Sequence, residues 1–324
     1  MSPSPMPRGR LGSSGLEVPR VALGCGNFGG IGTEPSLVGK GLSDAQAFGL
    51  MDTAWELGIT HFDTADAYAG GRSEAIVGRW IASRGVCPSL TTKTFFAMES
   101  DDAEGLGPAR VQRQLASSLR RLGVEQVDLY LAHWFDPDVP LAMTLDAFEC
   151  ARESGLVRAY GVSNFNATQL RTALAASAQP CALENGYSLL QRDDAEELLA
   201  LCARGSVAYL AHSPLCGGWL SGKYRRGEPF PAGSRAAHWP GMYSHLATGE
   251  TFAALDRFAA YARGHNRSMS GLALAWVLND PRVTQVIVGA SQPAHFTALA
   301  EALANPLHSD ERDRLTALCE TDAV

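Results

Sequence analysis

The sequence predicts an α/β protein built as a single closed (β/α)8 barrel. Short apolar segments alternate with longer amphipathic segments through eight cycles, and no break in composition separates them. Most of the apolar segments lack a clean polar alternation, as expected of parallel strands that are covered on both faces. A chain of 324 residues, 46% of them apolar, is long enough for one domain of this TIM-barrel type.

The eight expected strands follow one another along the chain. They are residues 21–26, 60–65, 90–94, 127–133, 158–163, 181–188, 207–213 and 285–290. Helices are predicted between them. Ser43 and Gln46 form a capping-box pattern at the start of one helix, and Pro108 opens another that ends at Gly123. Residues 192–205 carry acids in the first turn and Arg204 in the last, which suits the helix dipole.

The connection after the seventh strand is unusually long. From Leu215 to Glu250, glycine, proline, aromatic and basic residues mix without a helical period. A loop of this length in a compact domain is usually a lid or a binding loop. Residues 268–280 predict an extra helix before the eighth strand. We expect one domain over residues 1–324, in which residues 1–10 form a flexible tail.

Composition and charge exclude several classes of protein. The net charge is −7 and basic residues do not cluster, which argues against a nucleic-acid partner. Seven cysteines without C-x-x-C spacing argue against a disulfide framework or a zinc module, and favour a reducing compartment. The start lacks the apolar region of a secretory signal, and no apolar run is long enough to span a membrane. We expect a cytoplasmic protein without a metal or a membrane partner.

Two glycine patterns suggest nucleotide binding but lack the required context. Gly24, Gly26 and Gly29 form G-x-G-x-x-G after a strand, but no helix is predicted to open at Gly29, which disfavours a Rossmann fold. Residues 217–224 contain G-x-x-x-x-G-K, but Tyr224 stands where a phosphate loop needs Ser or Thr. A glycine-rich loop with a lysine can still hold a phosphate, which fits a cofactor with a pyrophosphate.

Four polar side chains follow successive predicted strands. Asp63 ends the second strand and Tyr68 lies in the loop after it, Lys93 ends the third strand, and His133 ends the fourth. The C-terminal ends of the strands in a barrel converge on one site. Each residue alone has a structural explanation, such as a capped turn or a packed ring. Their occurrence at consecutive strand ends favours a catalytic site.

The four side chains suit the reduction of a carbonyl group. Hydride addition leaves an alkoxide that needs a proton, and Tyr68 can donate it. We expect the Lys93 ammonium to lower the pKa of Tyr68 from about 10 toward neutrality. Asp63 would keep the buried Lys93 charged. His133 would hydrogen-bond the substrate oxygen and fix its orientation.

Longer motifs resemble the aldo-keto reductase superfamily. The motifs are residues 58–78, 91–94, 118–134, 155–165, 187–192, 213–224 and 286–291, which cover nearly the whole chain in order. The sequence is most similar to the branch of potassium-channel β subunits and bacterial aldose and aldehyde reductases. This resemblance implies Asp63, Tyr68, Lys93 and His133 as the catalytic tetrad. It implies NADP(H) as the cofactor, with NAD(H) as the alternative.

The resemblance also implies a set of binding residues. Ser163 and Asn164 would hold the nicotinamide carboxamide. The residues near the pyrophosphate would be Ser213, Leu215, Gly218 and Lys223, and those near the adenosine 2′-phosphate would be Arg235, Gly289 and Ser291. An aromatic substrate pocket would draw on Phe28, Trp134, Phe135, Trp219, Trp239 and Tyr243.

Three positions depart from the family pattern. His212 stands where the family commonly stacks Tyr or Trp on the nicotinamide, and Glu184 stands where it usually has Gln near the carboxamide. Downstream of residues 289–291, His295, Ala298 and Leu299 replace the usual adenosine-binding residues. We still expect His212, Glu184 and His295 to contact the cofactor. The choice between NADP and NAD stays open.

The expected function is NADP(H)-dependent reduction of an aldehyde, ketone or sugar carbonyl. One alternative is an NAD(P)-dependent sugar or alcohol dehydrogenase. Another is a regulatory protein that holds NADP(H) with little turnover. A barrel glycosidase ranks last, because Glu184 is the only further acid at a predicted strand end. The expected ligand is a small carbonyl compound or sugar.

Overall fold

The protein is divided into two compact units. A computed structural model describes residues 6–98, 104–192 and 195–320 of the chain. The first unit comprises Met1–Asn185, Asp194–His212 and Thr284–Pro293, and the second comprises Gly186–Asp193, Ser213–Val283 and Ala294–Val324. The second unit is therefore formed mainly by the connection after the seventh barrel strand and by the C-terminal segment. A single continuous domain stays a prediction.

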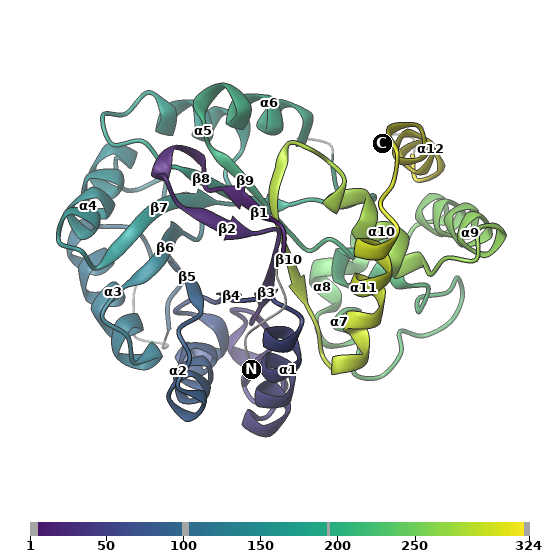
Figure 1. Cartoon of the computed structure of the whole chain (residues 1–324), viewed down its shortest axis with the longest axis horizontal. Helices are drawn as coiled ribbons and strands as arrows, with labels where there is room; N and C mark the ends of the chain where they lie inside the picture. The colour runs from purple at the N-terminus through teal and green to yellow at the C-terminus, as the bar shows by residue number, and fades with distance from the viewer. Residues whose placement is uncertain (1–5, 99–103, 193–194, 321–324) are drawn as a thin grey trace. The chain divides into compact units, whose positions relative to one another are not determined.

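A closed barrel of parallel strands forms the first unit (Figure 1). Within the described residues, the eight strands lie in the order β10-β3-β4-β5-β6-β7-β8-β9. Their bounds are β3 Val21–Gly24, β4 His61–Asp63, β5 Ser89–Thr94, β6 Val127–Ala132, β7 Val157–Ser163, β8 Ala182–Gly186, β9 Ala208–His212 and β10 Val283–Gly289. Each strand lies within a segment predicted from the sequence or extends it by one or two residues, so the barrel prediction is confirmed.

Helices connect consecutive strands from β3 to β9 and lie outside the ring of strands (Figure 1). They are α1 Asp44–Glu56, α2 Arg72–Arg84, α3 Pro108–Leu122, α4 Leu141–Glu153, α5 Ala167–Leu174 and α6 Ala195–Gly205. The predicted capping box is present, since Ser43 and Gln46 satisfy each other's backbone N–H groups at the start of α1. In the described ranges, no helix is both long and apolar enough to cross a membrane.

A short hairpin precedes the barrel and corrects the prediction of a tail over residues 1–10. Strand β1 (Arg8–Arg10) pairs antiparallel with β2 (Glu17–Pro19), while residues 1–5 lie outside the described residues. Leu11 and Val18 of this hairpin are buried with barrel residues such as Ala22 and Leu129. This apolar contact holds the hairpin against the barrel, and a three-residue polar strand gave no signal strong enough to predict it.

The second unit contains the long connection predicted after the seventh strand. This segment is not the irregular loop that we expected, because it holds a 3-10 turn, η4 (Cys216–Ser221), and two short helices, α7 (Arg235–His238) and α8 (Pro240–Tyr243). Ser234 caps the start of α7, a local signal that does not depend on a helical period. The longer helices are α9 Gly249–Gly264, α10 Met269–Leu278, α11 Phe296–Ala304 and α12 Ser309–Leu318, and α10 confirms the predicted extra helix.

The structure around both glycine patterns agrees with excluding a Rossmann fingerprint and a magnesium-binding phosphate loop. Gly29 has φ = +72°, and the next α-helix after it begins only at Asp44. The hydroxyl of Tyr224 donates to the carbonyl of Gly217 at 3.1 Å and accepts from the N–H of Ala236 at 3.2 Å. This hydroxyl is therefore used within the second unit and is not free to bind magnesium.

A buried carboxylate joins three segments of the second unit. Asp280 Oδ2 accepts hydrogen bonds from Tyr187 Oη at 2.9 Å, Arg282 Nη2 at 2.8 Å and Arg312 Nη2 at 2.6 Å. The carboxylate is fully buried, whereas both arginines keep part of their surface. Burial alone would raise the pKa of Asp280, but the bonds from Arg282 outweigh it and hold the pKa below its usual value.

We predict that Asp280→Asn lowers the free energy of unfolding by about 3 kcal/mol, because it leaves two arginines without their shared carboxylate. Because the pKa of Asp280 is lower in the folded protein than in the unfolded chain, the carboxylate contributes this stability at neutral pH. The stability is lost as the pH falls through the usual pKa of aspartate and then through the lower pKa of the folded protein. Urea unfolding at neutral pH and in mild acid measures both effects. Asp256→Asn, at an exposed position of α9, is the control, and equal midpoints for the two variants would contradict the prediction.

Candidate active site

The centre of the site is a buried ion pair at the ends of β4 and β5. Lys93 Nζ lies 2.5 Å from Asp63 Oδ1 and donates to the carbonyl of Thr64 at 3.0 Å. The side chain of Lys93 is 1% exposed. Burial opposes its charge, but Asp63, Glu184 and Tyr68 outweigh this effect and raise the pKa of Lys93 above its usual value. The predicted partnership of Asp63 and Lys93 is present in the structure.

Glu184 is a second carboxylate on the same ammonium. Its Oε1 atom lies 3.3 Å from Lys93 Nζ, and the residue is 2% exposed. It reaches this position from β8, where it is the register partner of Ser163 on β7. Burial, followed by the charge of Asp63, raises the pKa of Glu184 well above its usual value. We expected Glu184 at a cofactor carboxamide, and the structure shows its carboxylate on Lys93.

Tyr68 lies beside this cluster, at the start of the 3-10 turn η3 (Tyr68–Gly71). Lys93 Nζ is 5.4 Å from the centroid of the Tyr68 ring. Burial raises the pKa of Tyr68 to about 12, and Asp63 and Glu184 add to this rise, whereas Lys93 lowers it. We expected the pKa of Tyr68 to be lowered toward neutrality, and this prediction is wrong, because the net shift of the pKa is upward. Lys93 acts in the expected sense, but burial is the larger effect.

His133 packs between two aromatic rings after β6. Its ring centroid is 5.4 Å from that of Tyr68 and 5.1 Å from that of Phe96, and both pairs are edge-on. Burial holds the pKa of His133 well below its usual value, so the imidazole is neutral at neutral pH. Its Nδ1 atom is buried without a hydrogen-bond partner in the structure. A neutral imidazole in this position can hydrogen-bond an oxygen atom without adding charge.

The predicted carboxamide residues form a network in the first unit. Asn164 donates to the His133 carbonyl at 3.0 Å and pairs with His212 Nε2 at 3.1 Å. Ser163 Oγ donates to the Glu184 carbonyl at 2.8 Å. Burial lowers the pKa of His212 to about 4, so this imidazole is also neutral at neutral pH. The network connects the predicted nicotinamide residues, at the end of β7 and just beyond it, to His133.

The predicted pyrophosphate residues lie in the second unit. Around η4, Ser213, Cys216, Gly217 and Gly218 all have positive φ angles, between +48° and +93°. Leu215 accepts the N–H of Gly218 at 2.9 Å. Cys216 donates its N–H to the carbonyl of Ser213 at 2.8 Å, so this N–H is also used within the turn, and binding of a pyrophosphate here stays a prediction. Gly218 has φ = +93°, a conformation that favours glycine, and the flexible end of the Lys223 side chain lies against it.

The predicted adenosine residues are divided between the two units. In the second unit, Lys223 helps to lower the pKa of His295, although burial is the larger cause. Arg235 lies on α7 and lowers the pKa of Tyr243, against the larger effect of burial. Gly289 and Ser291 lie in the first unit, at and just beyond the end of β10, and both are exposed. Their roles at a cofactor stay predictions.

The predicted substrate-pocket aromatics differ in accessibility. Trp134 is 47% exposed, and Phe135 and Trp239 are partly exposed. Phe28, Trp219 and Tyr243 are buried. Trp219 packs against Tyr224, Phe230 and Phe252 within the second unit, which gives it a structural role. The substrate pocket stays a prediction, and the accessible rings are its best-supported members.

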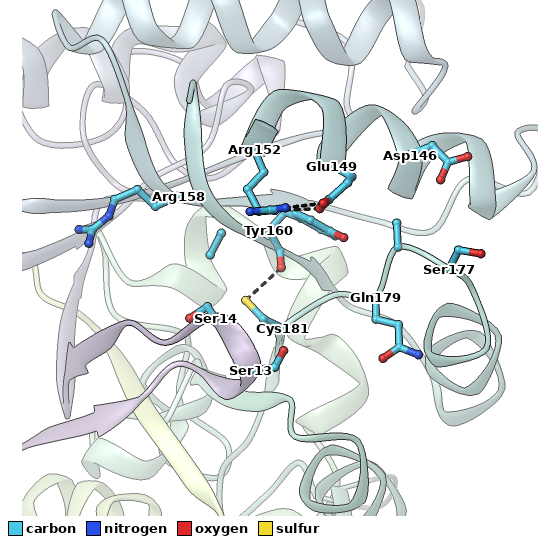
Figure 2. A pocket seen from close by; sticks show the side chains of 12 residues that line it. Ser13, Ser14, Asp146, Glu149, Arg152, Arg158, Tyr160, Ser177, Gln179 and Cys181 are labelled. Atoms are coloured by element: carbon cyan, nitrogen blue, oxygen red, sulfur yellow. Dashed lines mark hydrogen bonds and ion pairs between the residues drawn. The ribbon is translucent and has the colours of Figure 1, made fainter. Parts of the chain in front are cut away.

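A cavity of about 480 Å³ lies elsewhere in the first unit (Figure 2). Its lining includes the Arg152–Glu149 ion pair, Tyr160 and Cys181, whose Sγ donates to the Tyr160 carbonyl at 3.2 Å. These residues lie near the N-terminal ends of β7 and β8. The predicted tetrad lies at the C-terminal ends of β4 to β6 or just beyond them, so this cavity is separate from the predicted site.

Two groups at the site were not predicted from the sequence. Phe96 contacts the His133 ring, and Cys25 donates its backbone N–H to the Asp63 carbonyl at 2.8 Å. Cys25 directly follows β3 and Phe96 lies two residues after the end of β5, so their position near strand ends was the available signal. An apolar ring and a thiol carry no specific catalytic pattern, and so neither was selected.

A family model described as the Aldo/keto reductase family matches residues 20–320. The protein belongs to the aldo/keto reductase family. Membership in this family supports an oxidoreductase that reduces carbonyl groups. The resemblance noted in the sequence is thereby confirmed, including the branch to which it is most similar.

Two relatives illustrate the branch of this aldo/keto reductase. The chain is 29% identical to Aldo-keto reductase YhdN of Bacillus subtilis, with 96% of this chain and 92% of the relative covered. It is 32% identical to a putative voltage-gated potassium channel subunit beta of Schizosaccharomyces pombe, with 93% and 89% covered. The family therefore includes relatives described as reductases and relatives described as channel subunits.

Two solved structures share the fold of this aldo/keto reductase. The glycerol dehydrogenase AKR11B4 from Gluconobacter oxydans superposes with a TM-score of 0.81 at 26% identity, covering 96% of this chain and 94% of the other. The thermostable aldo-keto reductase Tm1743, in a complex with the inhibitor epalrestat, superposes with a TM-score of 0.74 at 26% identity, covering 97% and 100%.

We predict that Lys93→Met destabilises the protein by about 3–5 kcal/mol, because it leaves the buried Asp63 carboxylate without its cation. Adding Asp63→Asn to the same chain should restore part of the loss, since the unpaired carboxylate is then replaced by a neutral amide. Lys40→Met, at an exposed position, is the control. The midpoints of urea unfolding measure the three variants. A midpoint for Lys93→Met equal to that of Lys40→Met would show that the ion pair carries no stability.

Proposed function

We propose that the protein is an NADP(H)-dependent reductase of small aldehydes, ketones or sugar carbonyls. The observation that carries this proposal is the buried Lys93–Asp63 pair with Tyr68 and His133 beside it. The glycosidase alternative loses its support, because Glu184 is directed to Lys93 and not paired with a second acid across an open site.

Tyr68 acts as the proton donor in the proposed reaction. Its raised pKa keeps the hydroxyl protonated throughout the neutral range, which is the state that carbonyl reduction requires. As negative charge develops on the substrate oxygen, the nearby Lys93 ammonium stabilises the phenolate that Tyr68 becomes. His133 donates a hydrogen bond to the same oxygen and orients the carbonyl, as its neutral state allows.

The residues of the chain fit a dinucleotide cofactor. The positive φ angles from Cys216 to Gly218 and the adjacent Lys223 suit a pyrophosphate, and Arg235 suits a 2′-phosphate. When bound, NADPH would supply the hydride. The proposed contacts of Ser163, Asn164 and His212 with the nicotinamide end rest on the network that these residues form with His133.

The reverse reaction is the second candidate. The likeness to a glycerol dehydrogenase favours an NAD(P)-dependent alcohol oxidation by the same tetrad. Oxidation needs Tyr68 as a phenolate, and its pKa of about 12 disfavours that state at neutral pH. This difference makes reduction the better-supported direction. A regulatory protein with little turnover, as the channel-subunit relative suggests, is separated from both by an NADPH-oxidation assay on a panel of aldehydes.

We predict that Tyr68→Phe lowers kcat for carbonyl reduction by about 10²–10⁴-fold, because it removes the proton donor. NADPH should still bind, since the hydroxyl is not assigned to the cofactor. Steady-state kinetics and fluorescence titration with NADPH measure the two effects. Tyr261→Phe on α9 is the control and should change neither. A Tyr68→Phe enzyme that keeps more than about a tenth of the wild-type kcat would remove Tyr68 from the donor role.

We predict that Arg235→Ala weakens NADPH binding by roughly 10- to 150-fold, as expected for the loss of a charge-assisted hydrogen bond. NADH binding should change little, because NADH lacks the 2′-phosphate that Arg235 is proposed to hold. Arg225→Ala, at an exposed position nearby in the sequence, is the control. Dissociation constants for both cofactors test this prediction. Equal losses for NADPH and NADH, or a wild type that prefers NADH, would favour the NAD-dependent dehydrogenase.

A further inference from the structure

Two buried carboxylates share one cation in the first unit. Asp63 Oδ1 and Glu184 Oε1 lie 2.5 Å and 3.3 Å from Lys93 Nζ, and each of the three side chains is at most 5% exposed. Glu184 comes from β8, which lies far from β4 in the order of the barrel strands. The barrel interior therefore brings a second acid to a cation that Asp63 alone would neutralise.

The second oxygens of the two carboxylates lack partners. Asp63 Oδ2 and Glu184 Oε2 are both buried and make no hydrogen bond. One oxygen of each acid lies on the same Lys93 Nζ atom, so the two carboxyl groups meet around one nitrogen. A proton held between the two groups would satisfy oxygen atoms that otherwise remain buried and unpaired, which is costly.

Among the described residues, the titratable groups that interact with this cluster supply no second positive charge. They are Cys25 after β3, His61 on β4, Tyr68, His133 after β6 and His212 on β9. Burial keeps the three histidines neutral at neutral pH by lowering their pKa values. Burial raises the pKa values of Cys25 and Tyr68, so these two are neutral as well.

We propose that Glu184 is a neutral carboxylic acid in the folded protein and shares one proton with Asp63. The pair then carries a single negative charge opposite the single positive charge of Lys93. Two acids at one buried site retain one proton between them, because the two negative charges would repel each other if both groups ionised. Glu184 is a positioning residue: it acts through Asp63 and Lys93 and holds the ammonium beside Tyr68.

The shared proton has a consequence for Tyr68, and this step rests on the proposed function. When Glu184 loses its proton at alkaline pH, its charge raises the pKa of Tyr68 further. The phenolate needed for alcohol oxidation then forms at higher pH than it would beside a neutral amide. Glu184 therefore favours the protonated donor and the direction of carbonyl reduction.

The first experiment is independent of catalysis and compares the stability of wild type and Glu184→Gln from about pH 5 upward. The unfolded chain loses the glutamate proton near pH 4.3 and the folded protein keeps it. The folded-to-unfolded ratio of wild type should therefore fall about tenfold per pH unit relative to that of Glu184→Gln. Glu56→Gln at an exposed position is the control and should run parallel to wild type. Parallel curves for wild type and Glu184→Gln would overturn the proposal.

The second measurement keeps the proposal testable if Glu184→Gln does not fold. Difference infrared spectroscopy at about pH 8.5, where Asp66 with its pKa of about 7 is ionised, should show the carbonyl stretch of a protonated carboxyl in wild type. The signal should disappear in Asp63→Asn as well as in Glu184→Gln, because either change leaves one carboxylate for Lys93. A wild type without this signal, or a signal that survives in Asp63→Asn, would overturn the shared proton.

The third measurement tests the step that depends on the proposed function. In the oxidation direction, the rise of kcat/KM with pH should lie at lower pH in Glu184→Gln than in wild type, while the NADPH dissociation constant stays unchanged. If kcat/KM rises at the same pH in Glu184→Gln and in wild type, Glu184 does not influence the pKa of Tyr68. A wild type with no oxidoreductase activity would instead remove the proposed function, and the stability and infrared results would still decide whether Glu184 holds the proton.

Discussion

A lysine ammonium buried at the barrel's catalytic end is the constraint on which the rest of the site depends. Removing an ammonium from water costs several kcal/mol after relaxation, so it persists only where nearby carboxylates and carbonyls replace the water. Asp63, Glu184 and the carbonyl of Thr64 do so for Lys93. These partners come from β4, β8 and the loop after β4. The charge of one side chain therefore links strands from different parts of the barrel.

The same cluster determines the chemistry available to Tyr68. Three effects act on this hydroxyl, of which burial is the largest and opposes the charged form. Lys93 favours the phenolate, but Asp63 reduces that benefit by its negative charge, and Glu184 does so once it loses its proton. The sequence could identify Lys93 as the residue that favours the Tyr68 phenolate, because Lys93 lies at the end of the neighbouring strand. It could not weigh burial against that partner, since burial depends on how every neighbouring loop packs.

The strand ends were the part of the site that the sequence could predict. Asp63, Lys93 and His133 follow apolar segments that must be barrel strands, and a barrel directs those ends to one place. Glu184 lies within such a segment, on β8, and its direction depends on the stagger between strands far apart in the barrel. The hairpin of Arg8–Arg10 and Glu17–Pro19 was missed because its strands are three residues long and mostly polar. Short helices such as Arg235–His238 were missed because four residues cannot show a helical period.

Backbone strain is concentrated where the chemistry is proposed. Among the described residues, six non-glycine residues have positive φ angles: Ala69, Asn164, Ser206, Ser213, Cys216 and Asn266. Such a conformation costs of order 1–3 kcal/mol and persists only where the surroundings require it. Ala69 directly follows Tyr68, Asn164 bonds to His133 and His212, and Ser213 and Cys216 belong to the turn proposed for the pyrophosphate. Four of the six therefore adjoin proposed functional groups, which is the distribution expected if the backbone is held to aim donors at a ligand and not to optimise stability.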